Sequence, residues 1–557
     1  MAASSVTVHP SPIDIARAVG AAVPAEVSSK PLLGILGVVA GAGVVTLTSR
    51  MISLGMPDFR GLHGFGYDES AWIGSAFDAG LMFIGPFTVF LGGLMGPRRV
   101  LLTAAALFTV LLIFLPFAHS YSLVIAMALL GGLTSGTFYP LTLTFALRNI
   151  PLRYLPFTLA LYATFVDGAV NIAPSLYGWY REHLSSNWMF WNSALITPLM
   201  MICIYYGIPK ANAPKKSGKA PGFAGFLYAS AGLAMLLVAC EQGERLDWWR
   251  SGVFNSLFAG GSFFLLCALV RRLRSPNPLV ALPYLLRWNT ILLGCLLFWF
   301  RFTLCTTIIL IPQSLAIRGF EANQIGPAII WSAVPLIPLA FTAALLLLHK
   351  FDSRLLLAGG LACTAFAAWL NSLYTTAWAA QNFYRTELLT GIGQGFAFIG
   401  LVGCIVLQAI FTGGLAKPEW VLTLSAFFHV IRLFGGTAGA IYMGHFVAQR
   451  EKLHSNLLGL HVTGGDWITI QNFHAMTAGL YAKSYSLAAA GARSVDLIAA
   501  RLRLQAYSLS IIDGFLLIAW SCACALILVA LLRKSPLNYG DLSAVQQTLI
   551  AEKESKS

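Results

Sequence analysis

An aspartate in the middle of a long apolar segment is the residue of this sequence best suited to chemistry. The segment Pro156–Tyr180 can cross a bilayer, since a spanning helix needs about 20 apolar residues, yet it carries Asp167 near its centre. A charge at that depth costs about 2.5–3.5 kcal/mol on insertion scales, so an acid there indicates a function. Asn171, Pro174 and Gly178 follow at i+4, i+7 and i+11, on the same helical face as the acid. The structural alternative is an acid that one neighbouring helix satisfies.

Two further titratable residues are candidates for proton coupling. A buried carboxyl group suits this task because burial favours its neutral form, whereas a substrate or an arginine nearby favours its ionised form. Asp78 lies within the second apolar segment, and its alternative role is a fixed salt bridge with Arg50 on the first. His429 belongs to a residue type that titrates near neutral pH and could relay protons. A lone helical histidine is, however, more often a hydrogen-bonded core residue.

Three arginines also lie inside apolar segments, where a charge must be paired or solvated. They are the candidates for a charged cavity wall: Arg50, Arg301 and Arg432. Arg301, near the middle of its segment, can bind an anionic substrate or interact with one of the acids. The alternative is a purely structural ion pair. Three other titratable residues near segment ends are expected at the solvated interface: Glu387, Asp513 and His119.

Aromatic side chains are plentiful, at 12% of the residues. Apolar walls with few polar anchors suit flat or amphipathic organic molecules. Most aromatic residues in such segments simply pack. The candidates for a cavity wall are Phe77, Tyr139, Tyr162 and Trp299.

The composition predicts a polytopic membrane protein. Of the 557 residues, 57% are hydrophobic and 10% are charged, against about 25% charged in soluble domains. The net charge of +14 is spread in short clusters between apolar runs, so nucleic acid is not expected as a partner. The nine cysteines show neither a disulfide framework nor a zinc spacing, and we expect no metal and no cofactor.

Charge and Gly/Pro clusters divide the chain into about fourteen apolar spans, which predicts an all-α fold. Lys and Arg concentrate in alternate connections, and this pattern places both termini in the cytoplasm. The spans are expected near 31–55, 70–95, 100–118, 121–147, 156–180, 190–208, 223–241, 252–270, 289–312, 325–348, 355–375, 387–411, 419–447 and 508–532.

The polar tract KANAPKKSGKAPG is the most flexible join and divides the chain into two halves. The outer loop 448–507 is expected to form amphipathic turns on the membrane face, either as an ordered loop or as a docking site for an adaptor. The predicted parts are a cytoplasmic N-terminal arm at 1–30, an N-terminal six-helix bundle at 31–209, a cytoplasmic linker at 210–222, two inserted transmembrane helices at 223–275, a C-terminal six-helix bundle at 276–534 and a cytoplasmic C-terminal tail at 535–557.

Five tracts at collinear spacing carry a family resemblance: LSSNWMFWN at 184–192, ACEQGERLDWW at 239–249, PNPLVALPYLLRWN at 276–289, SAFFHVIRLFGGTAG at 425–439 and RLQAYSLSIIDGF at 503–515. Together they resemble the fourteen-span drug:proton antiporters of the major facilitator superfamily, the EmrB/QacA type. The resemblance implies two six-helix bundles plus two extra transmembrane helices. Because an arginine recurs at the matching family position, it also implies a mainly architectural role for Arg432.

The family's antiporter motif, a Gly- and Pro-rich pattern in the fifth span, corresponds to Ala169–Gly178. The resemblance implies that Asn171, Pro174 and Gly178 form a gate or seal, since glycine and proline let helices approach and bend. Three ionisable family positions are absent, and Thr48, Gly93 and Ala128 stand there instead. Coupling has therefore moved to other residues or differs in kind, with Asp167 as the first candidate and Asp78 as the second.

These observations predict a secondary active transporter, not an enzyme, that exports hydrophobic or amphipathic small molecules by proton antiport with alternating access. It is expected as a multi-pass protein of a bacterial inner membrane, with protons, cargo and lipid as partners. The resemblance further implies a periplasmic adaptor and an outer-membrane channel. The chain has no G-x-x-x-x-G-K-[ST] nucleotide loop, which argues against an ATP-driven pump.

Two other functions stay open at this point. The first is export of a specific metabolite or siderophore, including an anionic one, with altered or no proton coupling. The missing acids and the new Arg50 and Arg301 favour it. The second is a membrane-embedded enzyme or sensor, for which the sequence has no HExxH, G-x-S-x-G or paired-cysteine site.

Overall fold

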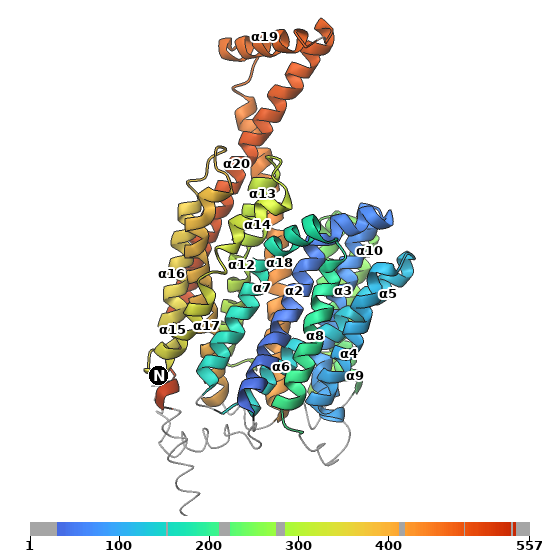
Figure 1. The fold of residues 1–557 in the computed structure, drawn as a ribbon, viewed down its shortest axis with the longest axis vertical. Helices are drawn as coiled ribbons and strands as arrows, with labels where there is room; N and C mark the ends of the chain where they lie inside the picture. The colour runs from blue at the N-terminus through green and yellow to red at the C-terminus, as the bar shows by residue number, and fades with distance from the viewer. Residues whose placement is uncertain are drawn as a thin grey trace, which may run out of the picture.

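Helices account for all regular structure in the described part of the chain (Figure 1). The computed structural model describes residues 30–151, 154–210, 223–274, 285–411, 418–483, 485–535 and 538–541. Twelve of its helices are long and apolar enough to span a membrane. α3 and the broken pair α14–α15 lie beside them, so each predicted span has a helical counterpart. The predicted all-α polytopic fold is confirmed.

The helices follow one another in the order of the predicted spans. The first six spans contain α2 (Pro31–His63), α3 (Tyr67–Met95), α4 (Pro97–Phe114), α5 (Tyr121–Ser135), α6 (Phe138–Asn149), α7 (Leu155–His183) and α8 (Trp188–Gly207). The two spans predicted as insertions contain α9 (Phe223–Gly243) and α10 (Gly252–Arg274). The remaining spans contain α12 (Trp288–Thr303), α13 (Ile311–Ala316), α14 (Ala322–Ile330), α15 (Leu336–Leu348), α16 (Ser353–Asn371), α17 (Tyr384–Phe411), α18 (Pro418–Gly459) and α20 (Leu487–Ala530).

The two ends of the helical body differ. We call the end where α2 begins and α20 ends the terminal side, and the opposite end, from which a helical hairpin projects, the hairpin side (Figure 1). Most of the predicted arm, linker and tail lies outside the described residues, namely 1–29, 211–222 and 542–557. The same holds for 275–284, which includes most of the tract that begins at Pro276.

Three spans are interrupted where the sequence predicted continuous helices. The fourth divides at Gly136 into α5 and α6, and Pro335 separates α14 from α15 because proline has no backbone N–H to donate. The ninth passes from α12 to α13 through a π-helical turn at Thr306–Leu310. In this turn the backbone oxygen of Ile308 accepts a hydrogen bond of 3.4 Å from Arg50 Nη2. Irregular backbone at membrane depth is tolerated where protein groups satisfy it, as here.

The segment 448–507 differs from its prediction. Instead of turns on the membrane face, α18 and α20 continue as helices of 42 and 44 residues and form the projecting hairpin, with α19 (Trp467–Tyr481) at its tip (Figure 1). Asp513 on α20 accepts bonds from Arg450 and His454 on α18, at 2.6 and 2.7 Å. These charged contacts pair the two helices, so their polar residues do not need the membrane surface.

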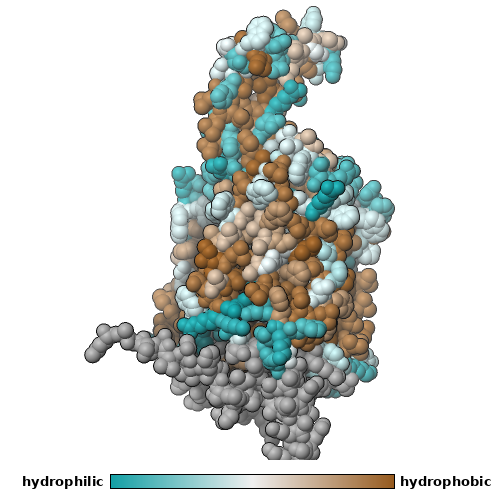
Figure 2. All heavy atoms as spheres, turned by 90° about the vertical axis from the view of Figure 1, so that its left-hand side faces the viewer, coloured by the Kyte–Doolittle hydropathy of each residue, from teal (hydrophilic) through white to brown (hydrophobic). Residues whose placement is uncertain are grey.

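Apolar side chains cover the lipid-facing flank of the body. Figure 2 shows them over the face formed by α15, α16 and α20. Phe341, Phe366 and Trp520 are each at least half exposed on these helices. In a bilayer such residues contact acyl chains, and the internal hydrogen bonds of the helices satisfy the backbone.

Glycines let the helices approach one another closely. A Cβ atom on Gly132 of α5 would lie 1.9 Å from the backbone oxygen of Phe77 on α3. On the same α3 helix, a Cβ atom on Gly74 would meet nothing within 4 Å. Contact between backbones is typical of membrane helices, whose association depends on van der Waals packing.

This contact predicts the cost of a larger residue. Gly132→Val should lower the free energy of unfolding by about 1–3 kcal/mol or more, because the backbone of α3 must move. The measurement is thermal unfolding of the purified protein in detergent. Gly74→Val is the matched control and should change the melting temperature much less. Equal effects of the two substitutions would contradict the packing of α3 against α5.

Candidate functional site

A stripe of buried polar groups without partners runs along α7. Asp167 is 1% exposed, and neither carboxyl oxygen has a hydrogen-bond partner. Asn171, one turn further, is fully buried with both amide atoms unpaired, and the Ser175 hydroxyl is unpaired as well. We call these three residues the α7 polar stripe. Each unsatisfied buried group costs about 1–3 kcal/mol, so the stripe needs a function in binding protons, water or cargo.

Polar groups of α17, in the second bundle, also lack partners. Glu387 and Gln394 are fully buried, and none of their side-chain oxygen and nitrogen atoms has a hydrogen-bond partner. The Glu387 carboxyl interacts electrostatically with Asp167. The two bundles therefore each contribute a buried acid to one interface.

The expected solvated position of Glu387 is wrong. A short 3-10 helix, Ala380–Phe383, precedes α17, and Phe383 is fully buried. The ring of Tyr384 stacks on Trp331 at 5.3 Å. These contacts cover the start of α17 and exclude water from the acid. The sequence carried one usable signal, a glutamate and a glutamine seven residues apart, which share one helical face.

The three predicted arginines are buried or half-buried, and none forms an ion pair in the described part of the chain. Arg301 of α12 interacts electrostatically with Asp167, and its Nε has no partner. A Cβ atom on Gly436 of α18 would lie 3.3 Å from Arg301 Nη2, so the glycine leaves room for the guanidinium group. Arg50 binds the π-helical turn, and the salt bridge considered for it with Asp78 is not present.

Arg432 and His429 of α18 connect this helix to the first bundle. The Arg432 guanidinium carbon lies 4.0 Å from the ring centre of Tyr139 on α6, a cation–π contact. The Tyr139 ring also contacts those of Tyr162, at 5.4 Å, and His429, at 5.7 Å. His429 Nε2 donates to the backbone oxygen of Leu81 on α3 at 3.3 Å, while its Nδ1 is unpaired.

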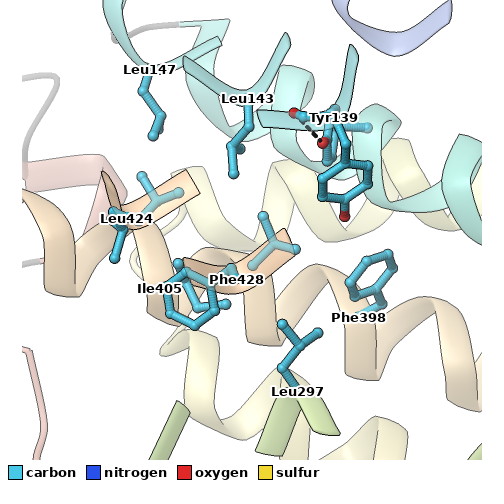
Figure 3. A pocket seen from close by; sticks show the side chains of 11 residues that line it. Tyr139, Leu143, Leu147, Leu297, Phe398, Ile405, Leu424 and Phe428 are labelled. Atoms are coloured by element: carbon cyan, nitrogen blue, oxygen red, sulfur yellow. Dashed lines mark hydrogen bonds between the residues drawn. The ribbon is translucent and has the colours of Figure 1, made fainter. Parts of the chain in front are cut away.

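Tyr139 stands at one edge of a small apolar cavity (Figure 3), and Tyr162 is among the residues that line it. Leu143 of α6, Leu297 of α12 and Phe398 of α17 line it. Its volume is about 30 Å³, space for a water molecule or two. The cavity is thus closed to a drug-sized molecule in this conformation.

The other two predicted aromatic residues lie differently. Trp299 of α12 is half-buried, and its indole N–H is buried without a partner. A buried tryptophan N–H normally has an acceptor, so the Trp299 N–H is available to donate a hydrogen bond to a cargo. Phe77 is buried against Gly131 and Gly132 of α5.

The bundles touch on both sides of Asp167. Towards the hairpin side, a Cβ atom on Gly178 of α7 would lie 2.9 Å from Cα of Asn323, and one on Gly326 of α14 would lie 2.6 Å from Cα of Ser175. Towards the terminal side, the hydroxyls of Thr144 and Ser425 are 3.3 Å apart. Gly178, one of three predicted gate residues, therefore lies in the first contact. Asn171 and Pro174 precede it on α7, which stays helical through the proline.

The structure adds an acid at the last position of the predicted span 223–241, which was not among the candidate site residues. Glu241 belongs to α9, and its carboxyl group lies within hydrogen-bonding reach of Asp78 on α3. An acid that directly follows an apolar run can still lie inside the bilayer, because the helix continues past the last apolar residue. Only the packing of α9 on α3 identifies its partner.

Comparisons with known proteins agree with this fold. Residues 38–440 match the profile of the Major Facilitator Superfamily. A probable multidrug resistance protein, EmrY of Escherichia coli (strain K12), is 24% identical over 424 residues, which cover 74% of this chain and 79% of EmrY. The fatty acid resistance protein FarB of Neisseria gonorrhoeae is 23% identical over 424 residues, covering 75% and 81% of the two chains.

Among solved structures, the proton:xylose symporter XylE, a major facilitator superfamily protein, has a similar fold. Its TM-score is 0.53 at 10% sequence identity, covering 93% of this chain and 99% of that chain. At this identity the likeness concerns the fold alone. The match to this superfamily confirms the prediction of a transporter rather than an enzyme.

The glycine contact between α7 and α14 predicts how the hairpin side opens. Ser175→Cys introduces a thiol at the contact, and a membrane-impermeant maleimide applied from the hairpin side should label it slowly. Adding Gly178→Leu should raise the labelling rate about tenfold, because an overlap of about 1.4 kcal/mol shifts a two-state equilibrium by that factor. Peptide mass spectrometry separates this thiol from the native cysteines.

Gly444→Leu is the matched control, since a Cβ atom there would meet nothing within 4 Å. An unchanged labelling rate with Gly178→Leu would mean that the contact of α7 with α14 does not seal the hairpin side.

Proposed function

Since this chain belongs to the major facilitator superfamily, we propose that it exports hydrophobic or amphipathic small molecules in exchange for protons. The observation that carries the proposal is the Asp167 carboxyl group, fully buried between the bundles without a hydrogen-bond partner. Intramembrane acids of this kind are costly to keep and are typical of proton relays in transporters.

The Asp167 carboxyl group can either bind a proton or, when ionised, interact with a positively charged group. With a proton on its carboxyl oxygen, the residue is neutral and fits the closed interface. Without the proton, its charge is left facing Arg301, the cation that acts on it, and a cationic or polar group of a cargo can compete for it. Binding of cargo and binding of a proton then exclude each other, which is the requirement for exchange.

Alternating access follows if the two contacts around Asp167 open in turn. Opening α7 from α14 exposes the α7 polar stripe to the hairpin side, where the proton is taken up and the cargo leaves. Separating Thr144 from Ser425 exposes the site to the terminal side, where the reverse occurs. The contacts lie on opposite sides of the acid, as a rocking movement of two bundles around a fixed site requires.

The cavity beside Tyr139 suits the apolar part of a cargo. Its lining is leucine, isoleucine, valine and aromatic side chains, so it offers few directional contacts and tolerates varied shapes. Relatives of this chain are named for multidrug resistance and fatty acid resistance. Such names support export of varied amphipathic molecules by this protein.

The setting of the transporter is also part of the proposal. The positive-inside pattern favours a cytoplasmic terminal side, in the inner membrane of a bacterium. The hairpin of α18 and α20 would then project into the periplasm. A periplasmic adaptor and an outer-membrane channel are the partners it would reach.

A second candidate function, export of an anionic cargo, is favoured by one observation. Arg301 and Arg432 are buried or half-buried beside the cavity, each with an unpaired Nε and no ion pair in the described part of the chain. Buried guanidinium groups bind carboxylates well because their planar donors match the two oxygens. Fatty acids, for which the relative FarB is named, are amphipathic carboxylates.

The proton-exchange proposal predicts the effect of removing the acid. In proteoliposomes with an imposed pH gradient, Asp167→Asn should reduce gradient-driven transport of a fluorescent drug at least tenfold, since mutating a proton-transfer group typically costs 10²–10⁴-fold. Gradient-independent counterflow of the same drug should remain. Asp513→Asn, in the projecting hairpin, is the control. Normal gradient-driven transport by Asp167→Asn would refute the assignment.

The two cargo classes predict different effects of Arg301→Gln. If the cargo is anionic, this substitution should weaken binding of a fluorescent fatty acid at least tenfold, because losing a buried charge partner costs about 2–5 kcal/mol. Binding of a cationic dye should not weaken. Arg493→Gln, on the exposed hairpin, is the control. Unchanged fatty acid binding would exclude Arg301 as an anion anchor.

A further inference from the structure

We propose that Asp78 and Glu241 form a second proton-binding site, in which one proton shared by two carboxyl groups ties the inserted helix α9 to both bundles. The contribution of this site to transport rests on the proposed proton exchange. The ability of the site to bind a proton does not depend on that proposal and can be measured separately.

The two carboxyl groups require a proton between them. Asp78 lies in the middle of α3 and Glu241 near the end of α9, and their side chains are within hydrogen-bonding reach. An ionised carboxylate only accepts hydrogen bonds, so two carboxyl groups can bond only when one is protonated. Two adjacent negative charges in a membrane interior would repel strongly. The stable state of this pair therefore carries at least one proton.

Neighbouring groups orient the Glu241 carboxyl. The hydroxyls of Ser75 on α3 and Thr437 on α18 lie within reach of it. Ser75 Oγ accepts a hydrogen bond of 2.7 Å from Gln242 Nε2, which leaves its own proton available for Glu241. The acid is thus contacted from α3 and from α18, which belong to different bundles.

A line of polar contacts leads from this pair to the hairpin side. Gln242 Oε1 accepts a bond of 2.6 Å from Arg245 Nε, and Arg245 Nη1 binds Asp68 at 2.7 Å. The Asp68 side chain is 76% exposed at the start of α3. These contacts fix α9 in register on α3, and they place polar groups between the surface and the acids.

Arg432 is the residue through which a change in the charge of the pair would act. It is 4% exposed, its Nε is unpaired, and it interacts electrostatically with Asp78. While the pair keeps its proton, the arginine rests on the Tyr139 ring, 4.0 Å away. When the pair loses the proton, the new negative charge attracts the guanidinium group away from that ring. The only other titratable group acting on the pair in the described residues is the Cys240 thiol.

The position of the pair gives the inserted helices a function. α9 packs along α3 and also contacts α18. Arg432 in turn acts on Arg301, and Arg301 acts on Asp167. The acids of the pair and Asp167 are therefore joined through two arginines and the cavity wall at Tyr139. Proton loss at the pair is transmitted to the cargo site through the movement of Arg432.

Infrared difference spectroscopy tests the proton directly. Purified protein in detergent is titrated from acidic to alkaline pH, and the carbonyl band of protonated carboxyl groups is followed. Glu241→Gln and Asp78→Asn should each remove or shift the same band, because either change breaks the shared bond. Spectra of both variants that superimpose on the wild-type spectrum would overturn the proposal.

Glu244→Gln is the matched control, three residues beyond Glu241. Hydrogen bonds from His445 and Trp248 hold the pKa of the Glu244 carboxyl below its usual value, so it is ionised at neutral pH. This substitution should leave the band unchanged. Glu241→Asp keeps a carboxyl group and should retain a shifted band, which separates loss of the proton from misfolding.

Transport by the same variants tests the role of the pair. Glu241→Gln should reduce gradient-driven transport in proteoliposomes at least tenfold and keep counterflow. If wild-type protein carries cargo without moving protons, the proposed function fails, while the infrared band still reports on the pair. If wild-type protein exchanges protons and Glu241→Gln does so at the same rate, the pair has no part in coupling and the inference fails.

Discussion

Burial of charge without a compensating partner is the constraint on which the structure depends. Asp167 lies buried with no hydrogen bond, and Arg301 and Arg432 form no ion pair among the described residues. A bilayer interior makes such groups expensive unless a proton, water or cargo completes them. In the proposed transport cycle, the occupants of these groups therefore link binding to movement.

Close backbone contacts hold together the helices around these groups. Glycines at 178 and 326 bring α7 and α14 into backbone contact, so a small rotation changes the contact completely. The breaks at Pro335 and at the π-helical turn supply bends near the site. A packed interface of this kind has discrete arrangements and does not deform continuously. In the proposed cycle, the charged groups decide between a closed and an open arrangement of this contact.

Much of this could be read from the sequence, because bilayer spans follow from length and hydropathy alone. The spacing of Asp167 from Asn171 and Gly178 predicts that the acid lies on an inner helical face, and it is buried there. Burial of Glu387 is not predicted by its place at a span end, because the apolar helix begins before it, with the 3-10 helix Ala380–Phe383 leading directly into α17. The role of Glu241 is not predictable from the sequence, because it depends on Asp78 of another helix. Contacts between helices are not visible in the local periodicity of either segment. The long hairpin was missed because its helices continue beyond the apolar stretch that defined the span.

The central claim, that cargo and proton compete for the buried acids, can be tested in one measurement on the purified wild-type protein. Cargo is added to the protein in weakly buffered detergent solution near neutral pH, and proton release is followed with a pH indicator. Competition predicts that binding releases protons in proportion to the bound cargo, with the amount falling as the pH rises. Saturating binding with no release of protons at any pH between acidic and alkaline conditions would contradict it.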